Sequence, residues 1–184
     1  MFPEDIISEI FSLTNKEKRT ALSLGVILEK DGSICYSELV QSLIKPNFRL
    51  SYDEADELID YAPKEEEDLS LISRILEKRN HWRKKKGSKE IKESYGKIIV
   101  KDNIPYLKII DQTISRLLIS EAMILFGNLI SNYTRKNKIP VPYRVQDCSA
   151  INNNTNSGNK ILDNYILKKR AGKTYYSSVP LPHN

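Results

Sequence analysis

The alternation of apolar and polar residues near the start of the chain predicts a β-hairpin. Residues of alternating character flank Asp31-Gly32, a dipeptide that supplies the positive φ angles of a tight turn. We therefore expect two antiparallel strands, over Thr20–Lys30 and Ser33–Lys45.

The pattern then changes to the spacing of helices. Ser51, with Glu54 three residues later, forms a capping-box pattern at the start of a helix that Pro63 ends. A second helix is expected over Glu65–Lys86. It has acidic residues in its first turn, basic residues in its last turn, and Gly87 as its stop signal.

The middle of the chain predicts a second hairpin and a long apolar helix. Lys97–Lys101 and Ile104–Ile110 flank the turn dipeptide Asp102-Asn103. Thr113–Asn137 is apolar on nearly every side, which is typical of a buried helix. It nevertheless contains Glu121, and a buried carboxylate is costly unless it has a partner. The helix alone favours the interpretation that Glu121 takes part in an internal ion pair. The alternative interpretation is that Glu121 makes a functional contact.

The last third of the chain is more irregular. Ile139–Gln146 contains two prolines and is predicted to be an extended edge segment. Residues 149–160 are rich in Asn and Ser and predict a loop or insert, and Ile161–Arg170 predicts a short basic helix. The predicted fold is α+β: antiparallel β-hairpins packed around a long buried central helix, with additional helices, in one domain over 1–184.

The charge of the chain is distributed unevenly. Residues 1–70 carry 7 basic and 16 acidic side chains, whereas residues 71–184 carry 22 basic and 8 acidic ones. A basic segment of this size can bind a polyanion by releasing its counterions, so nucleic acid is a reasonable partner. A solvated face of lysines is the alternative, and charge alone does not decide between them.

Several classes of site and location are disfavoured. The seven glycines form no phosphate-binding loop, and His81 and His183 lie at no zinc-ligand spacing from Cys35 or Cys148. The two cysteines are expected to be buried or inert thiols, and a disulfide between them is the alternative. No uninterrupted run of about 18 apolar residues occurs, so we expect no membrane partner. The chain starts without the features of a signal peptide, and we expect it in the cytoplasm, or in the stroma if it comes from a plastid.

A basic segment, Lys78–Lys86, surrounds the single tryptophan of the chain. Lys84 and Lys85 are candidates for contacts with phosphates. Trp82 either packs on the apolar side of the helix, which we favour, or stacks on a base.

Four stretches together resemble the ribonuclease II-type, or RNB, family of exoribonucleases. In the family's order and spacing, they are Leu50–Ala55, Trp82-Arg83 ahead of Gly87, Ser115–Leu125, and Ile139–Gln146. Met1–Glu4 and Pro180–His183 resemble further family segments at either end. The residues of these stretches are most similar to those of the cyanobacterial and plastid type of the family. The chain as a whole resembles an interior fragment of the catalytic domain.

The resemblance implies processive 3′-to-5′ hydrolysis of single-stranded RNA at a magnesium site in the parent enzyme. It places the aspartate cluster that holds the metal, and the catalytic arginine, outside the 184 residues. We therefore expect no catalytic residue and no tightly bound metal in this chain, and whether it is an enzyme by itself stays open. A complementary fragment of the same enzyme is a possible partner. The alternatives are a non-catalytic RNA-binding module and a truncated remnant without activity.

The resemblance also suggests which side chains meet the RNA. Tyr52 matches a tyrosine that approaches a ribose, and Glu121 matches a glutamate that senses the 2′-hydroxyl. The resemblance therefore favours the functional interpretation of Glu121 over the purely structural one. Arg116, Tyr143 and Arg144 match positions that organise the same channel, and His183 lies in the Pro-x-Pro-His segment. One departure concerns Gly87–Ile91, where the family usually has an aromatic residue able to stack on the RNA end.

Overall fold

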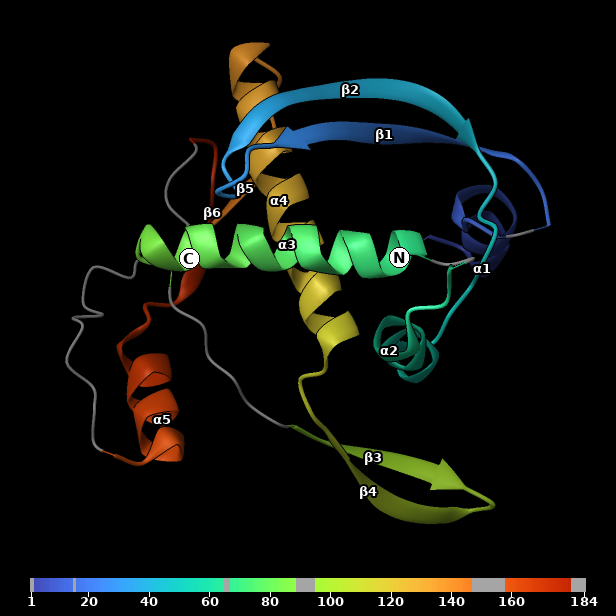
Figure 1. Cartoon of the computed structure of the whole chain (residues 1–184), viewed down its shortest axis with the longest axis vertical. Coiled ribbons are helices and arrows are strands. Elements are labelled where there is room, and N and C mark those ends of the chain that lie inside the picture. Colours follow the sequence, from blue (N-terminus) through green and yellow to red (C-terminus); the bar gives the residue numbers. More distant parts are fainter. Residues whose placement is uncertain (1, 15, 65–66, 89–94, 147–157, 180–184) are drawn as a thin grey trace. The chain divides into compact units, whose positions relative to one another are not determined.

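The computed structural model describes residues 2–14, 16–64, 67–88, 95–146 and 158–179 (Figure 1). The chain divides into two compact units, Met1–Trp82 and Arg83–Asn184. The boundary falls within one helix, α3 (Glu67–Lys85). The α+β class expected from the sequence is confirmed, since antiparallel strand pairs and helices share the described chain.

The first unit is built on one long hairpin. Strand β1 (Arg19–Leu28) pairs antiparallel with β2 (Ile34–Ile44), as predicted, with an irregularity in the register at Ile27/Leu28. Gly32 has a φ of 91°, and Asp31 Oδ1 accepts a hydrogen bond of 2.8 Å from the Ser33 backbone N–H. The Asp-Gly turn is therefore confirmed. A short helical segment, α1 (Glu4–Ile6) with the π-helix η1 (Ile7–Phe11), precedes the hairpin and was not predicted.

Helix α2 (Tyr52–Tyr61) begins with the predicted capping box. Ser51 Oγ accepts from the Glu54 backbone N–H over 3.3 Å, and Glu54 Oε2 accepts from the Ser51 backbone N–H over 2.6 Å. The helix ends at Ala62, which has a φ of 44°, directly before Pro63. These reciprocal hydrogen bonds satisfy donors that a helix start leaves unpaired.

The second unit contains two strand pairs and two complete helices among its described residues. Strands β3 (Tyr95–Lys101) and β4 (Ile104–Ile110) form the predicted hairpin, and both turn residues have positive φ, 53° at Asp102 and 60° at Asn103. Helix α4 (Ile114–Lys136) matches the predicted long helix, with Thr113 and Asn137 as its caps. Helix α5 (Lys160–Arg170) matches the predicted basic helix.

The chain after Ile139 pairs with a strand that the sequence did not predict. Strand β5 (Tyr143–Gln146) is antiparallel to β6 (Thr174–Ser177), and Gln146 Nε2 donates to the Gly172 carbonyl oxygen over 2.9 Å. Val145 is the most buried side chain of this ribbon, at 2% exposed. The Asn/Ser-rich stretch 149–160 lies almost entirely outside the described residues.

Helix α4 is less enclosed than its sequence predicts. Its buried residues are Ser115, Glu121, Leu125, Leu129 and Thr134, and of these Glu121, Leu125 and Leu129 follow one another at four-residue spacing along one face. Met123 is 65% exposed, and Ile119, Ile124 and Phe126 are also exposed. The expectation of burial on nearly every side is therefore wrong for the described residues, because an apolar side chain is buried only where other elements cover it.

Candidate nucleic-acid interface

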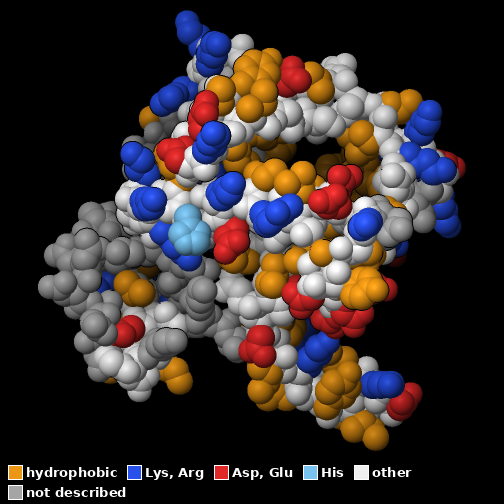
Figure 2. Space-filling model, viewed as in Figure 1, with side chains coloured by type: hydrophobic (Ala, Val, Ile, Leu, Met, Phe, Trp, Pro, Cys, Tyr) orange, Lys and Arg blue, Asp and Glu red, His pale blue; other side chains and the backbone are white. Residues whose placement is uncertain are grey.

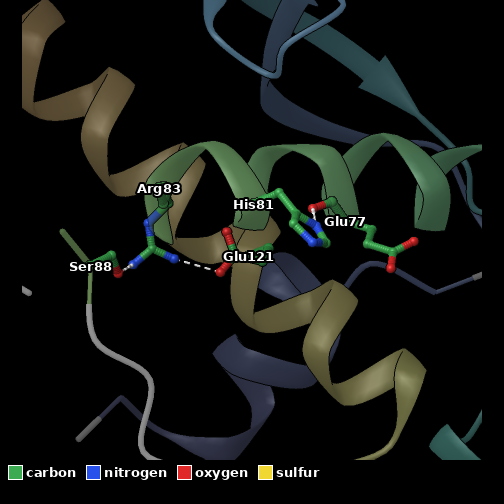
Figure 3. A network of polar contacts seen from close by, with 5 residues as sticks. All are labelled: Glu77, His81, Arg83, Ser88 and Glu121. Atoms are coloured by element: carbon green, nitrogen blue, oxygen red, sulfur yellow. Dashed lines mark hydrogen bonds and ion pairs between the residues drawn. The ribbon is translucent and has the colours of Figure 1, made fainter. Parts of the chain in front are cut away.

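The best-defined polar site of the second unit joins the last turn of α3 to the middle of α4 (Figure 3). Arg83 Nη1 lies 2.5 Å from Glu121 Oε1, and Arg83 Nη2 donates to Ser88 Oγ over 2.8 Å. Glu121 is buried at 3% exposed, and the Arg83 side chain is also largely shielded from solvent. A cation at this distance offsets part of the cost of burying a carboxylate.

The end of α3 explains why Ser88 reaches Arg83. Gly87 has a φ of 98°, and the backbone N–H groups of Gly87 and Ser88 bond back to the carbonyl oxygens of Lys84 and Arg83. This glycine-dependent helix end turns the chain sharply. Ser88 is thereby brought beside the Arg83 guanidinium, where its hydroxyl fixes the second nitrogen.

The sequence predicted a partner for Glu121 but did not identify Arg83. The need for a cation followed from the apolar surroundings of the carboxylate. Which residue supplies that cation could not be predicted, because Arg83 lies 38 positions away from Glu121 in the chain. The ion pair supplies the partner that the buried carboxylate requires, and contact of Glu121 with a ribose stays a prediction.

Lys84 and Lys85 follow Arg83 in the last turn of α3 and are both exposed. Lys and Arg side chains are prominent along α3 in Figure 2. Cations at the C-terminal end of a helix also suit the helix dipole. Lys84 and Lys85 are therefore accessible to an anionic ligand, as a phosphate contact would require.

Trp82 is half-buried, and one face of its ring is occupied by a neighbour. The Arg79 guanidinium carbon lies 4.2 Å from the centre of the ring. Arg79 is itself buried and donates from Nη1 to the Gly32 carbonyl oxygen over 2.9 Å. A base cannot stack on the covered ring face. These contacts therefore favour the interpretation that Trp82 packs within the protein rather than on a base. The sequence did not single out Arg79.

The other residues suggested by the resemblance lie in different settings. Tyr52 opens α2 in the first unit and is 40% exposed. Arg116, half-buried in the first turn of α4, is five positions from Glu121, or about 140° around the helix, so the two side chains leave different faces. His183 lies outside the described residues.

Tyr143 and Arg144 point to opposite sides of β5. The Tyr143 hydroxyl lies 3.1 Å from Thr134 Oγ1 on α4, which ties the ribbon to the helix. Arg144 is exposed and pairs across the ribbon with Tyr176, which is 75% exposed. The sequence did not identify Tyr176, since the pairing of β5 with β6 was not foreseen.

The described residues do not fit the magnesium site of the resembled family. Within residues 2–14, 16–64, 67–88, 95–146 and 158–179, no three His, Cys, Asp or Glu side chains come together in a way that could hold a metal ion. No metal-dependent step is therefore assigned to these residues.

Helix α4 also has the length and apolar character of a membrane span, with a mean hydropathy of 1.4 over an 18-residue stretch. The expectation that no such segment exists was too strict, because it required an uninterrupted apolar run. Core helices of soluble proteins have the same character, so a single helix of this kind is weak support for a membrane span.

Comparison with known proteins supplies the context for this site. The family model of the RNB domain matches residues 1–183. An uncharacterized ribonuclease of Synechocystis sp. is 33% identical over 149 residues, which cover 79% of this chain and 22% of that protein. The chloroplastic/mitochondrial ribonuclease II of Arabidopsis thaliana is 32% identical over 157 residues, covering 82% and 20%.

The fold agrees with these matches. RNase R of Mycoplasma genitalium, in a complex with ribose-methylated single-stranded RNA, shares the fold with a TM-score of 0.83 at 18% identity, over 99% of this chain and 35% of that one. The chain spans about a fifth of the length of the two ribonucleases compared above. With nearly its whole length matched by the family model, this chain belongs to the RNB domain family.

Proposed function

We propose that this chain is an RNA-binding segment of an RNB-family 3′-to-5′ exoribonuclease, in which Glu121 distinguishes RNA from DNA. The observation that carries the proposal is the buried Glu121 carboxylate, held by Arg83. A fixed carboxylate accepts a hydrogen bond from a ribose 2′-hydroxyl, which DNA lacks. Because Arg83 and Ser88 keep the carboxylate in place, it does not need to be reoriented when RNA binds.

The remaining contacts of this proposal are with the backbone of single-stranded RNA. Lys84, Lys85 and Arg144 are exposed cations that suit phosphates, and the side chains of Tyr52 and Arg116 are partly accessible. Contacts with phosphates give affinity but do not distinguish RNA from DNA. Selectivity for RNA is thereby assigned to Glu121.

The test compares the affinity of the purified chain for single-stranded RNA and DNA of the same sequence. We expect Glu121→Gln to remove the preference for RNA and to leave DNA binding unchanged. The matched control is Glu57→Gln, which removes one exposed carboxylate from α2. A variant that folds and keeps the wild-type preference would contradict the role of Glu121.

Hydrolysis by the whole enzyme is proposed from family membership. Incubation of 5′-labelled RNA with this chain and magnesium is expected to leave the RNA intact, because the family resemblance places the aspartates that hold the metal outside these 184 residues. Addition of the flanking RNB segments of the parent protein is expected to restore stepwise shortening from the 3′ end. Shortening of the RNA by this chain alone would contradict the proposal that hydrolysis requires the flanking segments.

We also propose that another segment of the same domain covers the aliphatic face of the β3–β4 hairpin. Ile98, Val100, Leu107 and Ile109 share this face through the strand register, and each is more than 60% exposed. A contiguous exposed apolar patch marks an interaction site. The chain covers only about a fifth of its relatives, so a complementary piece of the enzyme is the favoured partner.

A further inference from the structure

The two faces of the β3–β4 hairpin differ in chemistry. Directly paired residues of an antiparallel ladder lie on the same face, and residues two apart along a strand share it. The register places Tyr95, Lys97, Ile99, Lys101, Ile104, Tyr106, Lys108 and Ile110 on one face. We call this the lysine–tyrosine face. The opposite face, described above, carries aliphatic side chains.

Two lysines lie directly opposite each other on the lysine–tyrosine face. Lys97 pairs with Lys108 in the register, and both side chains are exposed. The β-carbons of such a pair are about 5 Å apart, and like charges in this position destabilise a sheet. A local arrangement that opposes folding is expected where function requires it.

Aromatic side chains accompany these cations. Tyr106 follows the same strand two positions before Lys108 and is 45% exposed, and Tyr95 is 57% exposed two positions before Lys97. Figure 2 shows apolar and cationic side chains together on this hairpin. Proteins that bind single-stranded nucleic acid combine cations, which meet phosphates, with aromatic rings, which stack on bases.

We infer that the lysine–tyrosine face of the β3–β4 hairpin is an additional binding surface for the single-stranded RNA substrate, in which Lys97 and Lys108 hold the phosphate backbone and Tyr106 stacks on a base. The inference rests on the proposed function, since it assumes that the chain binds RNA. Its position differs from that of Glu121, which lies on α4. The aliphatic face is free of charged side chains along the strands and suits protein contact, which leaves the lysine–tyrosine face for the anionic ligand.

The experiment measures the dependence of RNA affinity on salt. Each phosphate contact with single-stranded RNA contributes about 0.7 to the slope of log K against log salt concentration. Replacing Lys97 and Lys108 together by Gln is therefore expected to reduce the slope by about 1.4, and each single change by about 0.7. At 0.1 M salt the double variant should bind RNA roughly 25-fold more weakly than wild type, with equal affinity at 1 M as the reference.

The matched control replaces Lys16 and Lys18, two exposed lysines ahead of β1, by Gln. It removes the same net charge and is expected to leave the slope unchanged. Tyr106→Leu should weaken binding about tenfold without changing the slope, because stacking releases no counterions. Thermal unfolding checks that each variant folds.

The possible results separate this inference from the proposed function. If the wild-type chain prefers RNA and loses this preference in Glu121→Gln, while the Lys97/Lys108 variant keeps the full slope, the hairpin surface is wrong and the proposed function stands. An equal fall in slope in the control variant also overturns the hairpin surface. If the wild-type chain binds neither nucleic acid, the proposed function itself fails.

Discussion

Arg79 donates a hydrogen bond from Nη1 to the carbonyl oxygen of Gly32 over 2.9 Å, which joins α3 to the turn between β1 and β2. The approach is close enough that a β-carbon at Gly32 would meet the Lys78 carbonyl oxygen at 2.6 Å. Glycine is therefore required at this turn for two reasons. Its φ of 91° is unfavourable for other residues, and the neighbouring helix backbone leaves no room for a β-carbon.

Gly32→Ala is expected to destabilise the chain by about 3 kcal/mol, since both the left-handed backbone and the steric overlap oppose the new methyl group. Gly87→Ala is the matched control. Gly87 also has a positive φ, 98°, but a methyl group there would meet no neighbour within 4 Å, so only the backbone cost of about 1 kcal/mol remains. Urea unfolding of both variants measures the difference. Equal losses would show that the turn does not touch α3.

The Arg83–Glu121 ion pair predicts strong coupling between the two positions. Arg83→Met leaves a buried carboxylate without its cation and is expected to cost about 3 kcal/mol. In the double variant with Glu121→Gln, the charge is gone from both positions, so the loss should be well below the sum of the two single losses. A double-mutant cycle by chemical unfolding gives the coupling energy. Additive losses would contradict a direct interaction.

The capping box of α2 predicts a dependence on pH. Hydrogen bonds from Ser51, first from its backbone N–H, hold the pKa of the Glu54 carboxyl below its usual value of 4.5. A lowered pKa in the folded state adds stability above the ordinary pKa, and this stability is lost as the pH falls through the folded pKa. We expect the NMR shifts of α2 to report loss of its first turn in that acidic range. Glu54→Gln should show no such dependence, and an identical titration in both chains would contradict the cap.

Tyr143 was proposed from family resemblance to organise the RNA channel, and its hydroxyl lies 3.1 Å from Thr134 Oγ1. Tyr143→Phe is expected to cost about 1 kcal/mol of stability, because it removes one partly buried hydrogen bond. Thr134→Val combined with Tyr143→Phe should cost little more than either change. Affinity for RNA measured on the folded variant decides the role of the hydroxyl: unchanged affinity identifies it as structural, and a large loss identifies it as a contact with the ligand.

Cys35 is exposed, yet its thiol is expected to react slowly. A hydrogen bond to Glu29 and the negative charge of that carboxylate raise the pKa of the Cys35 thiol above its usual value of 9.0. Less thiolate is then present at neutral pH, and the thiolate is the reactive form. In a Cys148→Ser background, Glu29→Gln should accelerate alkylation of Cys35 by iodoacetamide. No change in rate would show that Glu29 does not act on the thiol.

The sequence by itself determined those elements whose stabilising interactions lie within a few residues. Asp31-Gly32 and Asp102-Asn103 specified their turns through backbone conformation, and Ser51 with Glu54 specified the start of α2. Gly87 ended α3 for the same local reason. The family was also accessible from the sequence, because its motifs are continuous stretches.

Only the tertiary structure decided which distant residues meet. Arg83 with Glu121 and Arg79 with Gly32 are separated by 38 and 47 positions, and many cations in the chain were equally plausible partners by composition. The pairing of β5 with β6 likewise joins segments on either side of the Asn-rich stretch. The partial burial of α4 also depends on what packs against it. Hydrophobicity measures the tendency of a side chain to leave water, whereas the neighbours that cover it come from the whole fold.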